Sequence, residues 1–442
     1  MQFSLKNYLT RRPYLKRVLA NVSWLFLDKI VRMGLGLLVS IWLARYLGPE
    51  EFGLFSYAIA LISIGSAISV LGLDSVVVKE LLIKPQDRGA LLGTSIVLQF
   101  VAGLLIFLII QGLVYYFQSN NPVLVLITAI LGPICFLRSS EVVKYWFESQ
   151  LLSKMTVRVE NAVFISFSCI KAVLIYYDFG LVTLVVAVLI ESIVVATALI
   201  LIYQFQGEVL RVRSFSGLRA VDLLGKSWPF VVSSIAVMVY LRIDVVMLES
   251  YLGATAVANY AVATRVAEVW YFIPGVIVAS VFPSIMDARN TDQMLYSTRL
   301  VRLLFVLFWI SVVIALTTSI ASQWIVTNLF GPRYLSAASI LSIITWSSVF
   351  VFVGMASGRW FLIENLQRQL LYRTVVGAII NVILNFILIP HYGALGAAWA
   401  TLASQAYANV ISNLFSKTTR PLFKLQIRAM AYPLLLLRAI KV

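Results

Sequence analysis

The two halves of the chain begin with the same series of short motifs. In the first half an apolar run separates Ser23-Trp24 from Tyr46-Leu47-Gly48, and Tyr57-Ala58 follows. The second half repeats the series as Ser227-Trp228, an apolar run, Tyr251-Leu252-Gly253 and Tyr260-Ala261. The copies lie about 204 residues apart with only small changes in loop length, so the sequence predicts two structurally related halves.

The composition makes a lipid bilayer the solvent for most of the chain. Hydrophobic residues make up 61% of the sequence and charged residues 12%, whereas a soluble domain carries roughly a quarter charged residues. A net charge of +16 would suit a nucleic-acid-binding protein, but the basic residues lie in loops on one side of the apolar runs. A duplicated half in so apolar a chain is typical of a transporter built from two repeats.

The apolar runs predict twelve transmembrane helices, because each is close to the ~20 residues that cross a bilayer. The expected spans are 24–46, 53–73, 90–116, 123–147, 159–177, 181–204, 228–250, 256–282, 300–321, 336–358, 370–389 and 394–415. Lys and Arg gather at both termini and in every second connection, whereas the opposite connections hold only Arg45 and Arg333. This distribution predicts an even number of spans with both termini in the cytoplasm.

These spans predict an all-α integral membrane protein with two pseudo-symmetric lobes of six helices each. The expected parts are an N-lobe at 1–206, a basic cytoplasmic linker at 207–226, a C-lobe at 227–416 and a tail at 417–442. The apolar run in the tail is too short to span, so we expect the tail to lie on the inner leaflet with its basic residues facing anionic lipid. No cysteine and histidine cluster is present, so no metal and no cofactor are expected.

Two turn motifs carry a family resemblance. Residues 45–58 read RYLGPEEFGLFSYA, and residues 328–334 read NLFGPRY. Together with the duplication and the span number, they make the chain resemble bacterial polysaccharide-unit flippases, the O-antigen and capsule repeat-unit translocases of the multidrug/oligosaccharidyl-lipid/polysaccharide exporter superfamily. The motif residues also have a structural interpretation that outweighs a catalytic one, because Gly48-Pro49 ends a span and permits a turn.

The resemblance implies a MATE-like, V-shaped pair of lobes around a central cavity, in the bacterial cytoplasmic (inner) membrane. It implies a transporter that flips undecaprenyl-pyrophosphate-linked oligosaccharide repeat units from the inner to the outer leaflet by alternating access, coupled to H+ or Na+. The expected partners are this lipid-linked oligosaccharide, membrane lipids, a polysaccharide polymerase and a chain-length regulator, and no nucleic acid.

Three other classes of protein stay open at this point. A drug or small-molecule exporter of the same superfamily has the same architecture, but an acidic cavity would favour it. A membrane glycan polymerase or glycosyltransferase usually needs a sizeable external loop or an acidic metal motif, and the sequence contains neither. A structural membrane scaffold is disfavoured by ionisable residues within the spans. We therefore expect no enzymatic activity.

Ionisable side chains at membrane depth usually face a cavity or a partner. Their first interpretation is mutual neutralisation, because Asp28 and Arg32, Arg138 and Glu141, and Arg265 and Glu268 are three or four residues apart. Lys171 and Glu191 lie at matched depths in neighbouring spans and form a further candidate pair. Such pairs can join helices within a lobe without any role in transport.

The second interpretation is a polar cavity for a pyrophosphate-linked sugar. Arginine offers a fork that suits phosphate oxygens, and a buried carboxylate can change protonation as a cavity opens. The candidates are Lys29, Arg32, Arg138, Arg242 and Arg265 for the pyrophosphate, Asp28, Glu191, Asp244 and Glu268 for ion coupling, and Tyr57, Tyr240, Tyr260 and Trp270 for sugar contacts.

Overall fold

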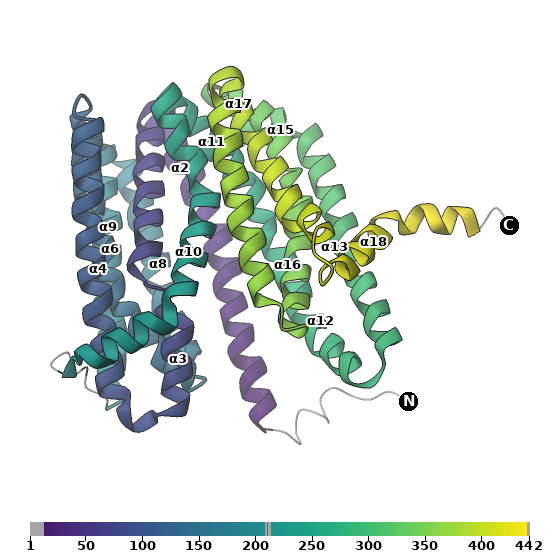
Figure 1. Ribbon diagram of the computed structural model, residues 1–442. Coiled ribbons are helices and arrows are strands. Elements are labelled where there is room, and N and C mark those ends of the chain that lie inside the picture. The colour runs from purple at the N-terminus through teal and green to yellow at the C-terminus, as the bar shows by residue number, and fades with distance from the viewer. Residues whose placement is uncertain (1–12, 208–209, 211–213, 440–442) are drawn as a thin grey trace. The chain divides into compact units, whose positions relative to one another are not determined.

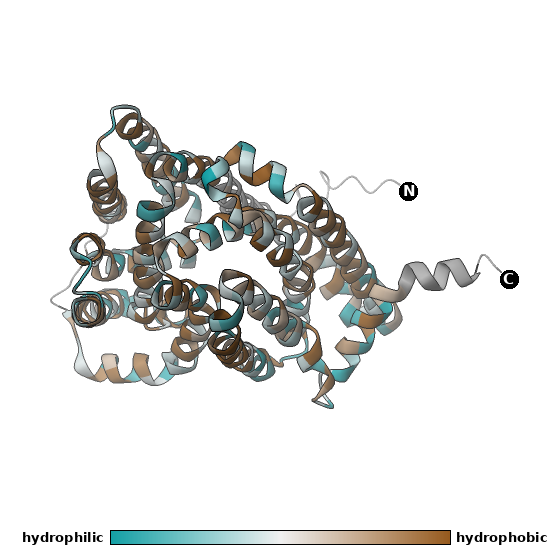
Figure 2. Ribbon diagram, turned by 90° about the horizontal axis from the view of Figure 1, so that it is seen from above, coloured by the Kyte–Doolittle hydropathy of each residue, from teal (hydrophilic) through white to brown (hydrophobic). Residues whose placement is uncertain are grey.

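The regular structure of the chain is helical wherever it is described (Figure 1). The computed structural model describes the backbone of residues 13–207, 210 and 214–439, and the side chains within these ranges from residue 32 to residue 431. Hydrophobic residues predominate along the helices (Figure 2). Because side chains are described only from residue 32 onward, those of Trp24, Asp28 and Lys29 lie outside the described residues.

Ten continuous helical segments of the described chain are long and apolar enough to cross a membrane. Two segments contain a bend: α2 (Pro13–Ser69) bends at Gly48 and α17 (Gln367–Asn409) bends at Gly393. Each bend falls where the sequence predicts an outer turn between two spans. The ten segments thus accommodate the twelve predicted spans, which confirms the predicted all-helical class and the approximate number of spans.

The other long helices overlap the predicted spans, and several short helices lie between them. The described part of the first half contains α3 (Leu73–Ile83), η1 (Pro85–Asp87), α4 (Arg88–Phe117), α5 (Pro122–Leu131), α6 (Ile134–Leu137), η2 (Arg138–Glu141), α7 (Val142–Ser149), α8 (Ser153–Tyr176) and α9 (Gly180–Phe205). The second half contains α10 (Gly217–Leu252), α11 (Ala254–Glu268), η4 (Val269–Tyr271), α12 (Phe272–Thr291), α13 (Gln293–Ile320), α14 (Ser322–Leu329), η5 (Pro332–Tyr334), α15 (Ser336–Ile344), α16 (Ser347–Ile363), η6 (Ile411–Leu414) and α18 (Arg420–Ala439).

Several predicted spans are interrupted rather than straight. The fourth span breaks into α5, α6, η2 and α7, and the eighth breaks at η4 between α11 and α12. Arg138 and Glu141 belong to η2 itself, and Glu268 is the last residue of α11. Breaks in membrane helices are tolerated where they are buried in protein or line a water-filled cavity. The charged residues beside these breaks are therefore candidates for the lining of such a cavity.

Contacts divide the chain into two compact units. The first comprises Met1–Leu43 and Ala58–Met238, and the second comprises Ala44–Tyr57 and Val239–Val442. In the first unit α8 packs along α9, and in the second α11 packs against α15 and α13 packs against α16 and α18. The lobe boundaries expected at 206 and 227 come from the basic stretch between the two sets of six predicted spans, and they stay a prediction.

The turn at residues 44–57 joins the second unit through the two motifs that carry the family resemblance. Arg45 donates hydrogen bonds to the carbonyl oxygens of Asn328 and Leu329, the latter at 2.6 Å. The Tyr334 hydroxyl donates to the carbonyl oxygen of Ala44 at 2.7 Å, and its ring lies edge-on to Phe52. Both motifs are therefore parts of one packed turn region.

The C-terminal helix α18 docks on the second unit by one face. Leu422, Gln426 and Ala429 are buried, whereas Lys424 and Arg428 are exposed. The Gln426 amide donates to the Ser357 hydroxyl at 2.8 Å and to a carbonyl oxygen of α17 at 2.9 Å. The first turns of the tail are thus anchored on protein, and its placement on the inner leaflet stays a prediction.

Candidate functional site

A buried carboxylate in the second unit is surrounded by neutral hydrogen-bond donors. Asp244 lies on α10 and is only 2% exposed. The Tyr260 hydroxyl from α11 donates to it at 2.5 Å, and the Thr401 hydroxyl from α17 donates to the same oxygen at 2.6 Å. The Asn385 amide, also from α17, donates to the other carboxylate oxygen.

The polar cluster continues along α17. The Asn385 amide nitrogen lies 3.1 Å from the side-chain oxygen of Asn381, whose own nitrogen lies 3.4 Å from the Ser404 hydroxyl. Within the described part of the chain, the side-chain oxygen of Asn385 is buried without a hydrogen-bond partner. The cluster therefore offers carboxylate, hydroxyl and amide oxygens, which are the ligands that hard cations prefer.

The hydrogen-bond partners of Asp244 do not balance its charge, because all are neutral. A buried ionised carboxylate is costly in a membrane unless a positive charge or a proton neutralises it. The sequence singles out Asp244, but it does not single out Asn381, Asn385 or Thr401. The spacing of the two asparagines, four residues apart in an apolar span, was the available signal, because it puts both on one helix face.

Two arginines and a glutamate lie on the same two helices, α10 and α11. Arg242 on α10 lies 3.8 Å from the carboxylate of Glu268 on α11. The Arg265 guanidinium lies 5.4 Å from the centre of the Phe52 ring, a cation–π contact. The prediction of an Arg265–Glu268 ion pair is wrong for the described residues. Arg265 extends toward Phe52, and Glu268 pairs with Arg242 on the neighbouring helix instead.

The first unit contains a chain of alternating charges. The Arg32 guanidinium lies 3.1 Å from Glu160, which also pairs with Lys144. Lys144 lies 3.5 Å from Glu141, and Glu141 accepts from Arg138 at 3.1 Å. Arg32, Lys144 and Arg138 thus contact these two carboxylates across α2, α8, α7 and η2.

The sequence singles out three of the five residues of this network. The Arg138–Glu141 pair is confirmed, and Arg32 is a candidate, but its described partner Glu160 lies on another helix. Lys144 and Glu160 were missed, although both fall inside predicted spans, where any ionisable side chain is a signal.

Lys171 and Glu191 form the cross-turn pair that their matched depths predict. The Lys171 ammonium on α8 donates to the Glu191 carboxylate on α9 at 2.6 Å, and the two side chains are 13% and 16% exposed. Their charges cancel locally, so this pair joins α8 to α9. A coupling role for Glu191 stays a prediction.

The aromatic candidates for sugar contacts have different surroundings. Tyr57 and Tyr260 are buried, and the Tyr260 hydroxyl already donates a hydrogen bond to Asp244. Tyr240 and Trp270 are half-buried on α10 and η4. Their contact with a sugar stays a prediction, as do the roles of Asp28 and Lys29.

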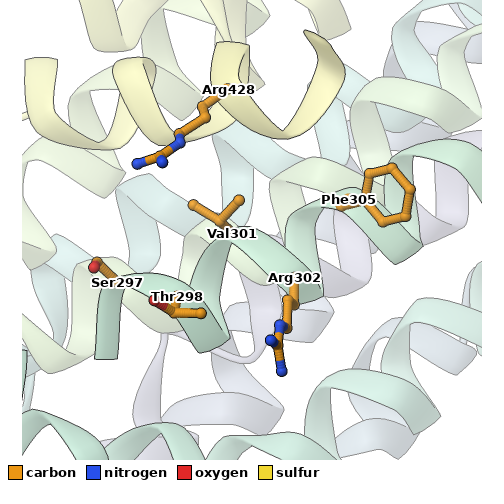
Figure 3. A pocket seen from close by; sticks show the side chains of 6 residues that line it. All are labelled: Ser297, Thr298, Val301, Arg302, Phe305 and Arg428. Carbon is orange, nitrogen blue, oxygen red and sulfur yellow. The ribbon is translucent and has the colours of Figure 1, made fainter. Parts of the chain in front are cut away.

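A pocket of about 290 Å³ lies between α13 and α18 of the second unit (Figure 3). Two exposed arginines, Arg302 from α13 and Arg428 from α18, line it beside Ser297, Thr298 and Phe305. The sequence does not predict this pocket, because its lining depends on how α18 packs against α13.

Ten long apolar helical segments, two of them bent at predicted turns, and charged groups inside them define a multi-pass membrane protein. Residues 18–289 match the model of the polysaccharide biosynthesis protein family. This match covers more than half of the chain, so the chain belongs to that family. The resemblance stated from the two turn motifs is thereby confirmed.

Two curated relatives come from Haloferax volcanii. The chain is 28% identical to the "Probable flippase AglR" over 185 residues, which cover 40% of the chain and 37% of that relative. It is 24% identical to the "Probable low-salt glycan biosynthesis flippase Agl15" over 404 residues, which cover 88% of the chain and 81% of that relative. The chain thus spans less than half of AglR and most of Agl15.

Solved structures with the same fold include two transporters. An inward-facing multidrug resistance MATE family transporter superposes with a TM-score of 0.72 at 15% identity, covering 90% of this chain and 96% of that one. The lipid II flippase MurJ in an inward closed conformation superposes with a TM-score of 0.68 at 17% identity, covering 93% and 91%. At these identities the likeness establishes the fold.

Proposed function

We propose that the protein is a flippase that moves undecaprenyl-pyrophosphate-linked oligosaccharide units from the inner to the outer leaflet of a bacterial cytoplasmic membrane. Family membership and the flippase names of both curated relatives support this class. Both termini lie in the cytoplasm in this proposal, and a polysaccharide polymerase and a chain-length regulator act on the exported product. Polymerisation itself is no part of the proposed activity.

The observation that carries the proposal is that a buried carboxylate and two arginines share the same pair of helices. Arg242 and Asp244 are two residues apart on α10, and Tyr260 and Arg265 are both on α11. The arginines offer charge-assisted hydrogen bonds to a pyrophosphate. A cationic drug would be repelled by them, which makes a drug exporter the weaker interpretation.

The coupling step takes place at Asp244 in this proposal. A proton or a sodium ion that binds among Asp244, Thr401 and Asn385 removes the uncompensated negative charge. Because Tyr260 donates to Asp244, this change alters the contact between α10 and α11 on which Arg242 and Arg265 lie. The binding of the ion and the hold on the pyrophosphate are thereby linked.

A complementation experiment tests the proposed substrate class. Arg242→Ala and Arg265→Ala are expressed in a strain whose own repeat-unit flippase is deleted, and surface glycan is measured against membrane protein level. Each variant is expected to lower surface glycan at normal protein level. Wild-type glycan with both variants would overturn the assignment of these arginines to the pyrophosphate.

A further inference from the structure

A separate pocket of the second unit lies where α17 begins and where η6 leads toward α18. Its volume is about 400 Å³. The first turns of α17 contribute Arg368, Tyr372 and Arg373 to its lining, and the opposite side contributes Tyr407, Ser412 and Ser416. Among the described residues that line it, none is Asp or Glu. The pocket does not include Arg242, Asp244 or Arg265.

Arg373 is the unusual residue of this pocket. It is only 9% exposed, and its guanidinium lies 4.6 Å from the centre of the Phe361 ring. Among the described residues its Nη1 atom is buried without a hydrogen-bond partner, and no carboxylate pairs with it. Stacking uses the face of the guanidinium and does not satisfy the N–H donors at its edge, of which Nη1 is the buried one without a partner. A buried donor without an acceptor is costly, so an anion in the pocket would be stabilised.

The surrounding sequence does not supply that anion. Glu364 is the last acidic residue of the sequence, so none follows it through residue 442. Glu364 itself accepts from Arg289 at 3.1 Å and from the Tyr296 hydroxyl at 3.0 Å. No carboxylate of the described chain forms an ion pair with Arg368 or Arg373, so their positive charge is available to an anion from outside the chain.

We propose that this pocket binds the phosphate group of a membrane lipid. The planar fork of Arg373 suits phosphate oxygens, and Arg368 at the exposed start of α17 adds a second charge. Tyr372 is exposed on the same turn, as is usual for tyrosines at the membrane–water boundary. The volume lies near the lower end of the roughly 300–1,000 Å³ of ligand pockets, which suits a headgroup and not a multi-sugar unit.

The experiment measures lipid binding to the purified full-length protein by native mass spectrometry. The probes are phosphatidylglycerol, a polyprenyl phosphate and diacylglycerol, with inorganic phosphate as competitor. Wild type is expected to retain the two phosphate lipids over diacylglycerol, and an equal concentration of inorganic phosphate is expected not to displace them. Preference for the polyprenyl phosphate would identify a carrier lipid as the source, and preference for phosphatidylglycerol would identify bulk phospholipid.

Arg373→Gln is expected to weaken this binding by about tenfold or more, because charge-assisted hydrogen bonds are lost. Arg302→Gln is the matched control, since it removes the same charge from an exposed arginine of a different pocket (Figure 3) and is expected to bind like wild type. Unchanged binding by folded Arg373→Gln, or displacement of the lipid by inorganic phosphate, would overturn the proposal.

Arg368→Gln keeps the test decisive if Arg373→Gln fails to fold. Arg368 is exposed, so its replacement leaves the packing intact, and weaker binding of both phosphate lipids is expected. Binding equal to wild type in this variant would count against the proposal in the same way. Because no step involves Asp244 or transport, failure here leaves the proposed flippase activity untouched.

Discussion

Gly48 and Gly253 hold the same backbone conformation at equivalent points of the two repeats. Their dihedral angles are φ 72°, ψ 176° and φ 76°, ψ −177°. This region of backbone space is essentially restricted to glycine. The repeated Tyr-Leu-Gly motif therefore encodes one turn used twice.

Gly48→Ala and Gly253→Ala are each expected to destabilise the protein by about 1–3 kcal/mol. The cost comes from backbone strain and not from a clash, because a Cβ atom at Gly253 would meet nothing within 4 Å and one at Gly48 would lie 3.6 Å from Arg333. Thermal unfolding in detergent measures the loss. Gly225→Ala, in the interior of α10 and equally free of neighbours, is the control and should unfold no earlier than wild type. Equal unfolding temperatures for all three variants would contradict the account of the turn.

Glu160→Gln is expected to destabilise the first unit, because it leaves Arg32 and Lys144 without their shared carboxylate. Glu160 has a side chain only 12% exposed, and removing one partner of a largely buried ion pair costs up to about 3–5 kcal/mol. Because the Arg32 side chain is partly exposed, we expect a cost in the lower part of this range. Glu148→Gln on α7 makes the same chemical change at an exposed position and should be near neutral. An unfolding temperature for Glu160→Gln that matches Glu148→Gln would show that the charge network does not hold these helices together.

The sequence predicts contacts that are close along the chain better than contacts that are distant. Arg138–Glu141 lies within one turn, and Lys171–Glu191 joins two helices through a short turn, and both pairs are confirmed. The pairing of Arg32 with Glu160 depends on how two helices far apart in the sequence pack, which spacing alone does not determine.

The same reason explains what was missed around Asp244. Its partners Asn385 and Thr401 come from α17, more than one hundred residues later. Arg265 and Glu268 have the right spacing to pair, but Phe52 from the other repeat competes for the guanidinium. A local pattern cannot foresee a competitor from another part of the fold.

A cation that binds at Asp244 is expected to stabilise the folded protein. Ligand at about one hundred times its dissociation constant contributes about 2.7 kcal/mol, so the unfolding temperature of wild type should rise with sodium at constant ionic strength, or with proton concentration at constant sodium. Asp244→Asn should lose this response, and the exposed Asp287→Asn should keep it. A response that is identical in wild type and Asp244→Asn would remove Asp244 from the coupling step.

The most direct test of the central claim is flipping in proteoliposomes. The probe is a fluorescent polyprenyl-pyrophosphate oligosaccharide, and its movement between leaflets is followed by quenching from outside, with and without a sodium or proton gradient. The proposal predicts gradient-dependent movement with wild type, and a loss of gradient dependence with Asp244→Asn reconstituted at equal density. Movement no faster than in protein-free liposomes, or equal gradient dependence in wild type and Asp244→Asn, would contradict it.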